Sequence, residues 1–167
     1  PAPPAFPPLP GRPGGLGHWV GLSHPAAQTL PMAFDLADLS ADARDFLTER
    51  HLATLTTARP DGSPHVTPVG FSYDVEARIA RVITWSASRK AIHAADMAEA
   101  GRRAVLCQVD GARWMSLEGT VRLVSDADGI APGVRGYAAR YREPKDRDDR
   151  VVIEIDVDRI IGSGRLR

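Results

Sequence analysis

The chain has 167 residues, in which 21 Lys and Arg side chains balance 21 Asp and Glu side chains. This length fits one domain with an ordinary buried core. The balanced charge excludes the broad positive field of general nucleic-acid binders and anionic-membrane binders, and no apolar run reaches the ~18 residues that a membrane span needs.

Residues 1–31 differ in composition from the rest of the chain. They hold 9 of the 14 prolines, 5 of the 15 glycines and a single charged side chain, Arg12. This composition predicts a disordered or polyproline-type leader, and it lacks the basic start and continuous apolar stretch of a secretory signal. We therefore place the folded domain at residues 32–167, with Met32 as its expected start, and expect a cytoplasmic protein.

The single cysteine, Cys107, lies in an apolar run. One cysteine excludes an intrachain disulfide and a zinc site built from cysteines. We expect a buried structural thiol in a reducing compartment.

The first predicted elements are a helix and a β-hairpin. Ser40 can cap a helix that runs to about Arg50. A threonine-rich strand over 51–59 and a second arm over 65–73 flank the turn signal at 60–63. Pro68 cannot donate to a ladder, so its arm is expected at an edge, at a bulge or at the start of a strand.

The remaining elements follow the same reasoning from alternation and turn signals. We expect a helix over 89–100 and strands over 79–85, 104–110, 113–125 and 151–158. Residues 126–142 are expected to be helical from Val134, because Gly129, Pro132 and Gly133 interrupt the first half. Six strands with about three helices predict a mainly β protein, a small antiparallel barrel rather than a doubly wound sheet.

The strongest chemical signal is the stretch from Thr84 to Lys90, where hydroxyl groups and two cations meet between a strand and a helix. Arg89 and Lys90 in a first helical turn oppose the helix dipole, which suggests that an anion, most naturally a phosphate, completes the site. The alternative is that Ser88 merely caps the helix and that both cations are solvated.

Other polar residues give weaker signals. The histidines lack metal-site spacing and no serine lies in a nucleophile elbow, so we expect neither a metal site nor a hydrolytic triad, and a cofactor would carry any chemistry. The strand 113–119 suits core and dimer packing. The basic and aromatic segment 137–150 could bind an acidic group, although its interleaved acids favour a solvated loop.

Several stretches resemble the pyridoxamine 5'-phosphate oxidase-like split β-barrel superfamily, which comprises flavin and deazaflavin oxidoreductases. They are LATLTTARPDGSPHVTPVGFSYD, ITWSASRKAIHA and RWMSLEG, within about residues 39–162. AVLCQVDGARWMSLEG, YAARYREP and RVVIEIDVDRIIGS are especially similar to an actinobacterial deazaflavin-dependent branch. The resemblance implies a six-stranded, FMN-binding split-barrel type of fold, and a homodimer with each cofactor in a groove between two barrels.

The resemblance also assigns cofactor-binding residues by position. The phosphate turn corresponds to Thr84, Ser88, Arg89 and Lys90, and the strand along the cofactor ring to His65, Thr67 and Pro68. Trp114 and Met115 correspond to the strand that completes the groove, possibly contributed by the other subunit. Ser88 stands where some relatives place another basic residue, and no catalytic residue is assigned.

The resemblance implies an oxidoreductase in which reduced coenzyme F-420, an 8-hydroxy-5-deazaflavin, gives a hydride to a small planar conjugated acceptor. A biliverdin-like tetrapyrrole is the leading acceptor. The alternatives are an FMN-dependent relative, a carrier that sequesters the deazaflavin or a tetrapyrrole, and a structural protein without a flavin. Because the chain ends just past its last strand, we do not expect vitamin B6 oxidation.

Overall fold

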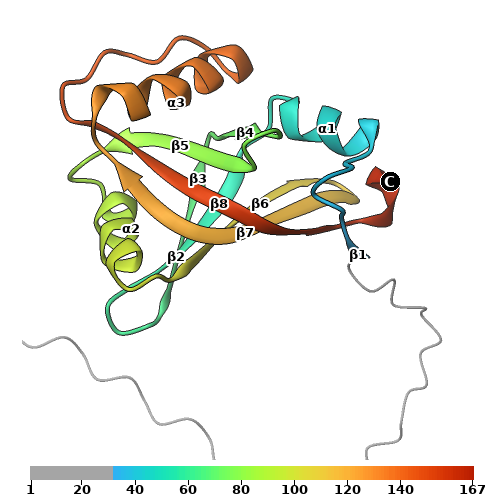
Figure 1. Ribbon diagram of the computed structural model, residues 1–167, viewed down its shortest axis with the longest axis horizontal. Helices are drawn as coiled ribbons and strands as arrows, with labels where there is room; N and C mark the ends of the chain where they lie inside the picture. Colours follow the sequence, from blue (N-terminus) through green and yellow to red (C-terminus); the bar gives the residue numbers. More distant parts are fainter. Residues whose placement is uncertain (1–31) are drawn as a thin grey trace, which may run out of the picture.

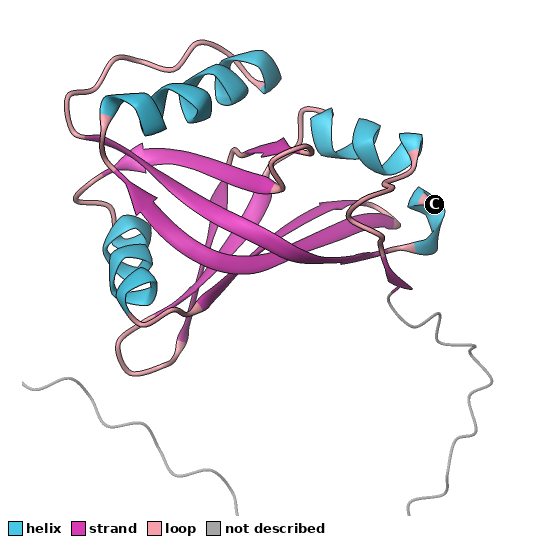
Figure 2. Cartoon of the chain, viewed as in Figure 1, coloured by secondary structure: helices cyan, strands magenta, loops and turns pink. Residues whose placement is uncertain are grey.

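The computed structural model describes residues 32–167, so the predicted leader lies outside the described residues. One antiparallel sheet forms the centre, and three α-helices lie along its margins (Figures 1 and 2). The strands are β1 (Met32–Ala33), β2 (Ala53–Ala58), β3 (Pro64–Val69), β4 (Ser72–Asp74), β5 (Ile79–Trp85), β6 (Arg103–Asp110), β7 (Arg113–Val124) and β8 (Arg150–Gly162). The helices are α1 (Ala41–Thr48), α2 (Arg89–Glu99), α3 (Ala127–Arg140) and a terminal 3-10 turn (Gly164–Leu166).

The strand order explains why the barrel is split. The sheet runs β3-β2-β6-β7-β8-β5-β4, and β1 pairs with β8. The sheet curls so that β7 and β8 cross in front of β2 and β3 (Figure 1). Within residues 32–167 the two edge strands, β3 and β4, make no ladder with each other. The predicted antiparallel split barrel with flanking helices is confirmed, with eight strands rather than six. No helix in this part of the chain is long and apolar enough to span a membrane.

The predicted strand over 65–73 is in fact two strands on opposite edges of the sheet. β3 pairs with β2 and ends at Val69, whereas β4 pairs with β5. Pro68 lies in β3, an edge strand, as its missing N–H group required. The chain crosses the split at Gly70, where a Cβ atom would come within 2.8 Å of the Tyr137 ring.

The core lies inside the curled sheet, and α1 and α2 pack against it. The fully buried side chains include Phe46 of α1, Met97 of α2 and Leu55 of β2. Ser40 caps α1 as predicted, with its Oγ accepting a hydrogen bond from Ala43 N at 3.1 Å. Leu39 and Leu47 are buried in the same core cluster as Phe46, so the apolar side of α1 faces the core.

The third helix begins earlier than the glycine and proline content predicted. It starts at Ala127, and the Asp126 carboxylate caps it by accepting from Gly129 N at 2.9 Å. Gly133 is buried against Val152 of β8, where a Cβ atom would lie only 2.9 Å from a methyl group. Close contact with the sheet therefore offsets the low helix propensity of this segment.

The last strand is longer than predicted, because it continues past Asp158 to Gly162. A register shift at Glu118/Gly119 of β7 lets the two long strands stay paired around the bend. Glu154 of β8 is buried and accepts a hydrogen bond from Arg81 Nε at 2.9 Å. At Glu154 an ion pair rather than water therefore covers the strand, whereas Asp158 further along it is exposed.

Candidate cofactor pocket

A pocket of about 710 Å³ lies at the split, where the two parts of the sheet face each other. Its walls come from the end of β3 with Gly70, from the end of β5, from the start of α2, from Tyr137 of α3 and from the segment 142–150. This volume is within the range that holds small ligands and cofactors. The pocket contains Pro68, Thr84 and Lys90 of the predicted cofactor residues.

The turn between β5 and α2 is held by two buried hydroxyl groups. Thr84 Oγ1 lies 3.1 Å from Ser88 Oγ, and Ser88 Oγ accepts a hydrogen bond from Ala91 N at 3.3 Å. Ser88 is therefore the helix cap that the sequence suggested. The first turn of α2 leaves the backbone N–H groups of Arg89 and Lys90 without partners in the described structure. These groups and the helix dipole favour an anion at this end of α2.

Lys90 brings an unpaired positive charge to the pocket. Its Nζ lies 4.8 Å from the centroid of the Trp85 ring, and no acidic side chain of residues 32–167 comes within ion-pair distance of it. Burial lowers the pKa of Lys90 from its usual 10.5, because the charged form loses contact with water. Arg89 is exposed beside it and does not line the pocket.

The segment 142–150 contributes more to the pocket than its sequence indicated. Its side chains are mostly exposed, as expected of a solvated loop, but four cations from it line the pocket: Arg142, Lys145, Arg147 and Arg150. With Lys90 the lining holds five cationic side chains against one acidic one, Glu143. The interleaved acids had favoured a solvated loop, and only the fold brings the cations to the turn before α2.

His65 and Thr67 lie on β3 near the pocket but do not line it. The His65 ring packs edge-on against the buried His93 ring of α2, with 4.8 Å between centroids, and its Nδ1 is 3.4 Å from Thr57 Oγ1. Burial is the main reason that the pKa of His65 falls below 6.5, and the charges of His93, Arg59 and Lys90 lower it further. His65 is thus favoured in its neutral form.

Trp114 and Met115 lie away from this pocket in the single chain. Met115 is fully buried in the core, and Trp114 is half-buried opposite Val109 in the hairpin of β6 and β7. The resemblance allowed these residues to complete the groove of the other subunit, so their assignment stays a prediction.

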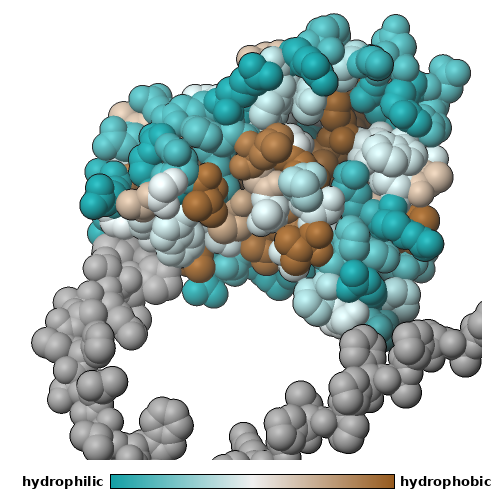
Figure 3. Space-filling view, turned by 180° about the vertical axis from the view of Figure 1, so that it is seen from behind, coloured by the Kyte–Doolittle hydropathy of each residue, from teal (hydrophilic) through white to brown (hydrophobic). Residues whose placement is uncertain are grey.

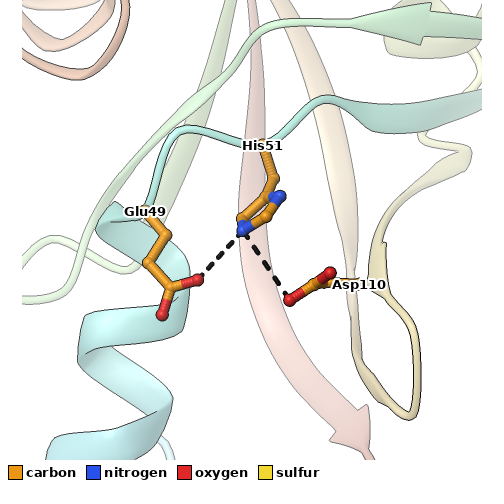
Figure 4. Close-up of side chains that lie close together, drawn as sticks. All are labelled: Glu49, His51 and Asp110. Atoms are coloured by element: carbon orange, nitrogen blue, oxygen red, sulfur yellow. Dashed lines mark hydrogen bonds and ion pairs between the residues drawn. The ribbon is translucent and has the colours of Figure 1, made fainter.

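A second group of polar side chains, Glu49, His51 and Asp110, has ligand atoms within 4.8 Å of one another (Figure 4). No sequence motif indicated this group. Arg113 Nη1 and Nη2 lie 2.8 and 2.9 Å from the two Glu49 carboxylate oxygens, and Arg113 also pairs with Asp110. Hydrogen bonds from Arg113 lower the pKa of Glu49 to about 2. Because Arg113 contacts both carboxylates and His51 lies 2.9 Å from Glu49, the group is an ion-pair network between α1 and the β6–β7 hairpin.

Comparison with known proteins agrees with this architecture. The family model of pyridoxamine 5'-phosphate oxidase matches residues 39–163. The chain is 52% identical over 128 residues to the F-420-dependent biliverdin reductase of Mycobacterium tuberculosis, which covers 77% of this chain and 90% of that protein.

Solved structures show the same fold at low sequence identity. A structure described as an F-420 reductase has a TM-score of 0.55 at 23% identity, covering 70% of this chain and 94% of that one. A conserved hypothetical protein of Mycobacterium tuberculosis has a TM-score of 0.61 at 23% identity, covering 76% and 87%.

Proposed function

The chain belongs to the pyridoxamine 5'-phosphate oxidase family. Because its pocket also contains the start of α2 and several cationic side chains, we propose that it is an F-420-dependent reductase. The observation that carries the proposal is Lys90, a partly buried cation that has no acidic partner among residues 32–167 and lies at the start of α2. The 52% identity to an F-420-dependent biliverdin reductase supports the choice of cofactor and of reaction class.

The residues of the turn fit a phosphorylated cofactor. The Ser88 cap already satisfies Ala91 N, which leaves the two preceding N–H groups to donate to phosphate oxygens. Lys90 would add a charge-assisted hydrogen bond, and Arg89 a second cation at the rim. The segment 142–150 as a whole holds four cations and four acids, but its pocket-lining residues are four cations and one acid, which raises the local positive potential for further anionic groups of a ligand.

The protein contributes position and surroundings, whereas the cofactor supplies the reaction. When bound, reduced F-420 supplies a hydride from its C5 atom to the acceptor. The turn before α2 holds the phosphate end, and β3 with Pro68 forms a wall along the pocket. No side chain of the pocket is placed as a general acid, so the proton that completes reduction comes from water or from one of the cationic neighbours.

We assign the acceptor as a planar conjugated molecule, with biliverdin-like tetrapyrroles first. This choice rests on the name of the 52% identical relative and on the pocket volume of about 710 Å³. The propionate groups of a tetrapyrrole are carboxylates, which suits the cations Arg142 and Lys145.

We further propose that the molecule works as a homodimer through the outer face of β2, β3 and β6. Three large apolar side chains are exposed there: Leu52 at 61%, Val66 at 58% and Val109 at 59%. Seen from behind, apolar side chains gather at the centre of the molecule between hydrophilic margins (Figure 3). Cys107 is half-buried on the same side of β6 rather than fully buried as expected, because none of the three helices covers this face. An uncovered apolar sheet face of this kind suits a second copy.

Single-turnover oxidation tests the proposed function. The protein is mixed anaerobically with reduced F-420, biliverdin is added, and cofactor oxidation is followed by absorbance. The reductase proposal predicts oxidation that depends on both protein and acceptor. Tight binding of both molecules without oxidation would identify a carrier instead, and a yellow protein that binds only FMN would identify an FMN-dependent relative.

A further inference from the structure

Trp85 is the exposed aromatic side chain at the edge of the pocket. It is the last residue of β5 and is 41% exposed, although large aromatic side chains normally bury most of their surface. Two cations lie against its ring: Lys90 Nζ at 4.8 Å and Arg147 Cζ at 5.2 Å from the centroid. Both distances fall within the range of cation–π attraction.

These contacts join two parts of the chain that are about 60 residues apart. Arg147 donates to the Asp149 carboxylate at 2.8 and 3.0 Å, and Asp149 O accepts a hydrogen bond from Ser86 N at 2.9 Å. The segment 142–149 is thus fastened to the turn before α2 at two points, through the Trp85 ring and through the Ser86 backbone. As a result, Lys145 lies in the same pocket as Lys90.

A lysine side chain has many rotamers, and fixing one of them for a ligand costs entropy. A ring that already holds the ammonium group reduces this cost. We propose that Trp85 is a positioning residue for anion recognition, which holds Lys90 and the pocket-lining cations of the segment 142–149 together around a phosphate group. This inference rests on the proposed function only where the phosphate is that of the cofactor.

The alternative role for Trp85 is stacking on the ring system of the ligand. The two roles predict different losses of affinity for a ligand without a phosphate when Trp85 is replaced. A positioning role affects only ligands that carry the phosphate, whereas a stacking or merely structural role affects both kinds of ligand by the same factor.

The test compares ligand pairs that differ in the phosphate alone: FMN with riboflavin, and 8-hydroxy-5-deazariboflavin 5'-phosphate with 8-hydroxy-5-deazariboflavin, whose side chain ends in a hydroxyl group. Dissociation constants are measured by fluorescence titration for the wild type, Trp85→Leu, Trp85→Phe and Lys90→Ala. Arg135→Ala is the matched control, because Arg135 is an exposed cation of α3 that does not line the pocket.

We expect Trp85→Leu to reduce the ratio of the phosphate-free to the phosphorylated dissociation constant by about tenfold. Trp85→Phe, which keeps an aromatic face, should restore most of the ratio. In the Lys90→Ala background Trp85→Leu should change the ratio by less than about threefold, since the ring then positions only the segment 142–149. An unchanged ratio, or equal losses for both members of a pair, would overturn the proposal.

Inorganic phosphate separates this inference from the proposed function. If neither flavin nor deazaflavin binds, the proposed function fails, and phosphate titrated against the Trp85 indole N–H resonance then decides the inference. A shift that Lys90→Ala abolishes supports it, and no shift overturns it.

Discussion

Arg140 of α3 donates a hydrogen bond from Nη2 to Oε1 of the fully buried Gln108 of β6, at 2.7 Å. The same guanidinium donates to Glu49 O at 2.8 Å and to Phe71 O at 2.9 Å, and Gln108 Nε2 donates to Phe46 O at 2.7 Å. Phe71 follows Gly70, which lines the pocket. One half-buried cation therefore fixes α3, α1 and the pocket wall relative to the sheet.

Replacing this cation should destabilise the whole fold. Arg140→Ala leaves the Gln108 amide oxygen and Phe71 O without their donor, while Glu49 O keeps its hydrogen bond from His51 N, so we expect a loss of about 2 to 4 kcal/mol in the free energy of unfolding. Urea unfolding followed by circular dichroism measures it. Arg135→Ala, on the exposed side of the same helix, should stay within about 0.5 kcal/mol of the wild type. A loss below about 1 kcal/mol for Arg140→Ala would contradict the account of this network.

The lowered pKa of His65 predicts how the stability of the fold depends on pH. Its lowered pKa means that the unfolded chain binds a proton more readily than the folded protein does. The stabilisation from the neutral ring is complete above pH 6.5 and is lost as the pH falls through the lower folded pKa. We expect the urea midpoint to drop less between pH 7.5 and pH 5 in His65→Asn than in the wild type. Equal drops in the two proteins would show that His65 does not contribute to the loss of stability in acid.

Lys90 predicts how ligand binding depends on base. Because its pKa is lowered by burial, Lys90 loses its proton below the usual 10.5, and its attraction for a phosphate is present at neutral pH and lost as the pH rises. The affinity for FMN should therefore decline in the wild type before it declines in Lys90→Arg, whose guanidinium keeps its charge. Both proteins are titrated with FMN between pH 7.5 and 10. Because the ligand is the same, its own ionisation affects the two affinities equally. Parallel profiles would show that Lys90 does not hold the anion.

Val66 tests the proposed dimer. Its side chain is exposed on the edge strand β3, so Val66→Arg places a charge on the apolar face at little expense to the folded subunit. Light scattering after size-exclusion chromatography should give a dimer for the wild type and a monomer for the variant. A variant that remains dimeric would place the interface elsewhere.

The elements that could be predicted from the sequence are those with strong local signals. Ser40 and Ser88 marked helix starts, and Pro68 marked an edge strand, because caps and missing donors act within a few residues. Gly133 led to a predicted start of α3 that was too late. A glycine is needed there because α3 packs closely on Val152, and this contact arises only in the folded protein.

The pocket residues also fall into those that the sequence could predict and those that it could not. The role of Lys90 in anion binding could be inferred from the sequence, because a cation in the first turn of a helix opposes the helix dipole. This argument needs only neighbouring residues. The cations Arg142 and Lys145 could not, because their acidic neighbours in the sequence predicted a solvated loop. The contact between Arg147 and Trp85, which fastens that segment to the turn, joins residues far apart in the chain. No local pattern carries such a contact.

The most direct test of the central claim is a fluorescence titration of the wild type and of the double variant Arg89→Ala with Lys90→Ala, using F-420 and FMN in parallel. The account predicts that the wild type binds F-420 in preference to FMN. It also predicts that the double variant weakens F-420 binding by about 100-fold or more, since two charge-assisted contacts to the phosphate are lost. Equal F-420 affinity in the two proteins, or no binding to either, would contradict a cofactor phosphate site at the start of α2.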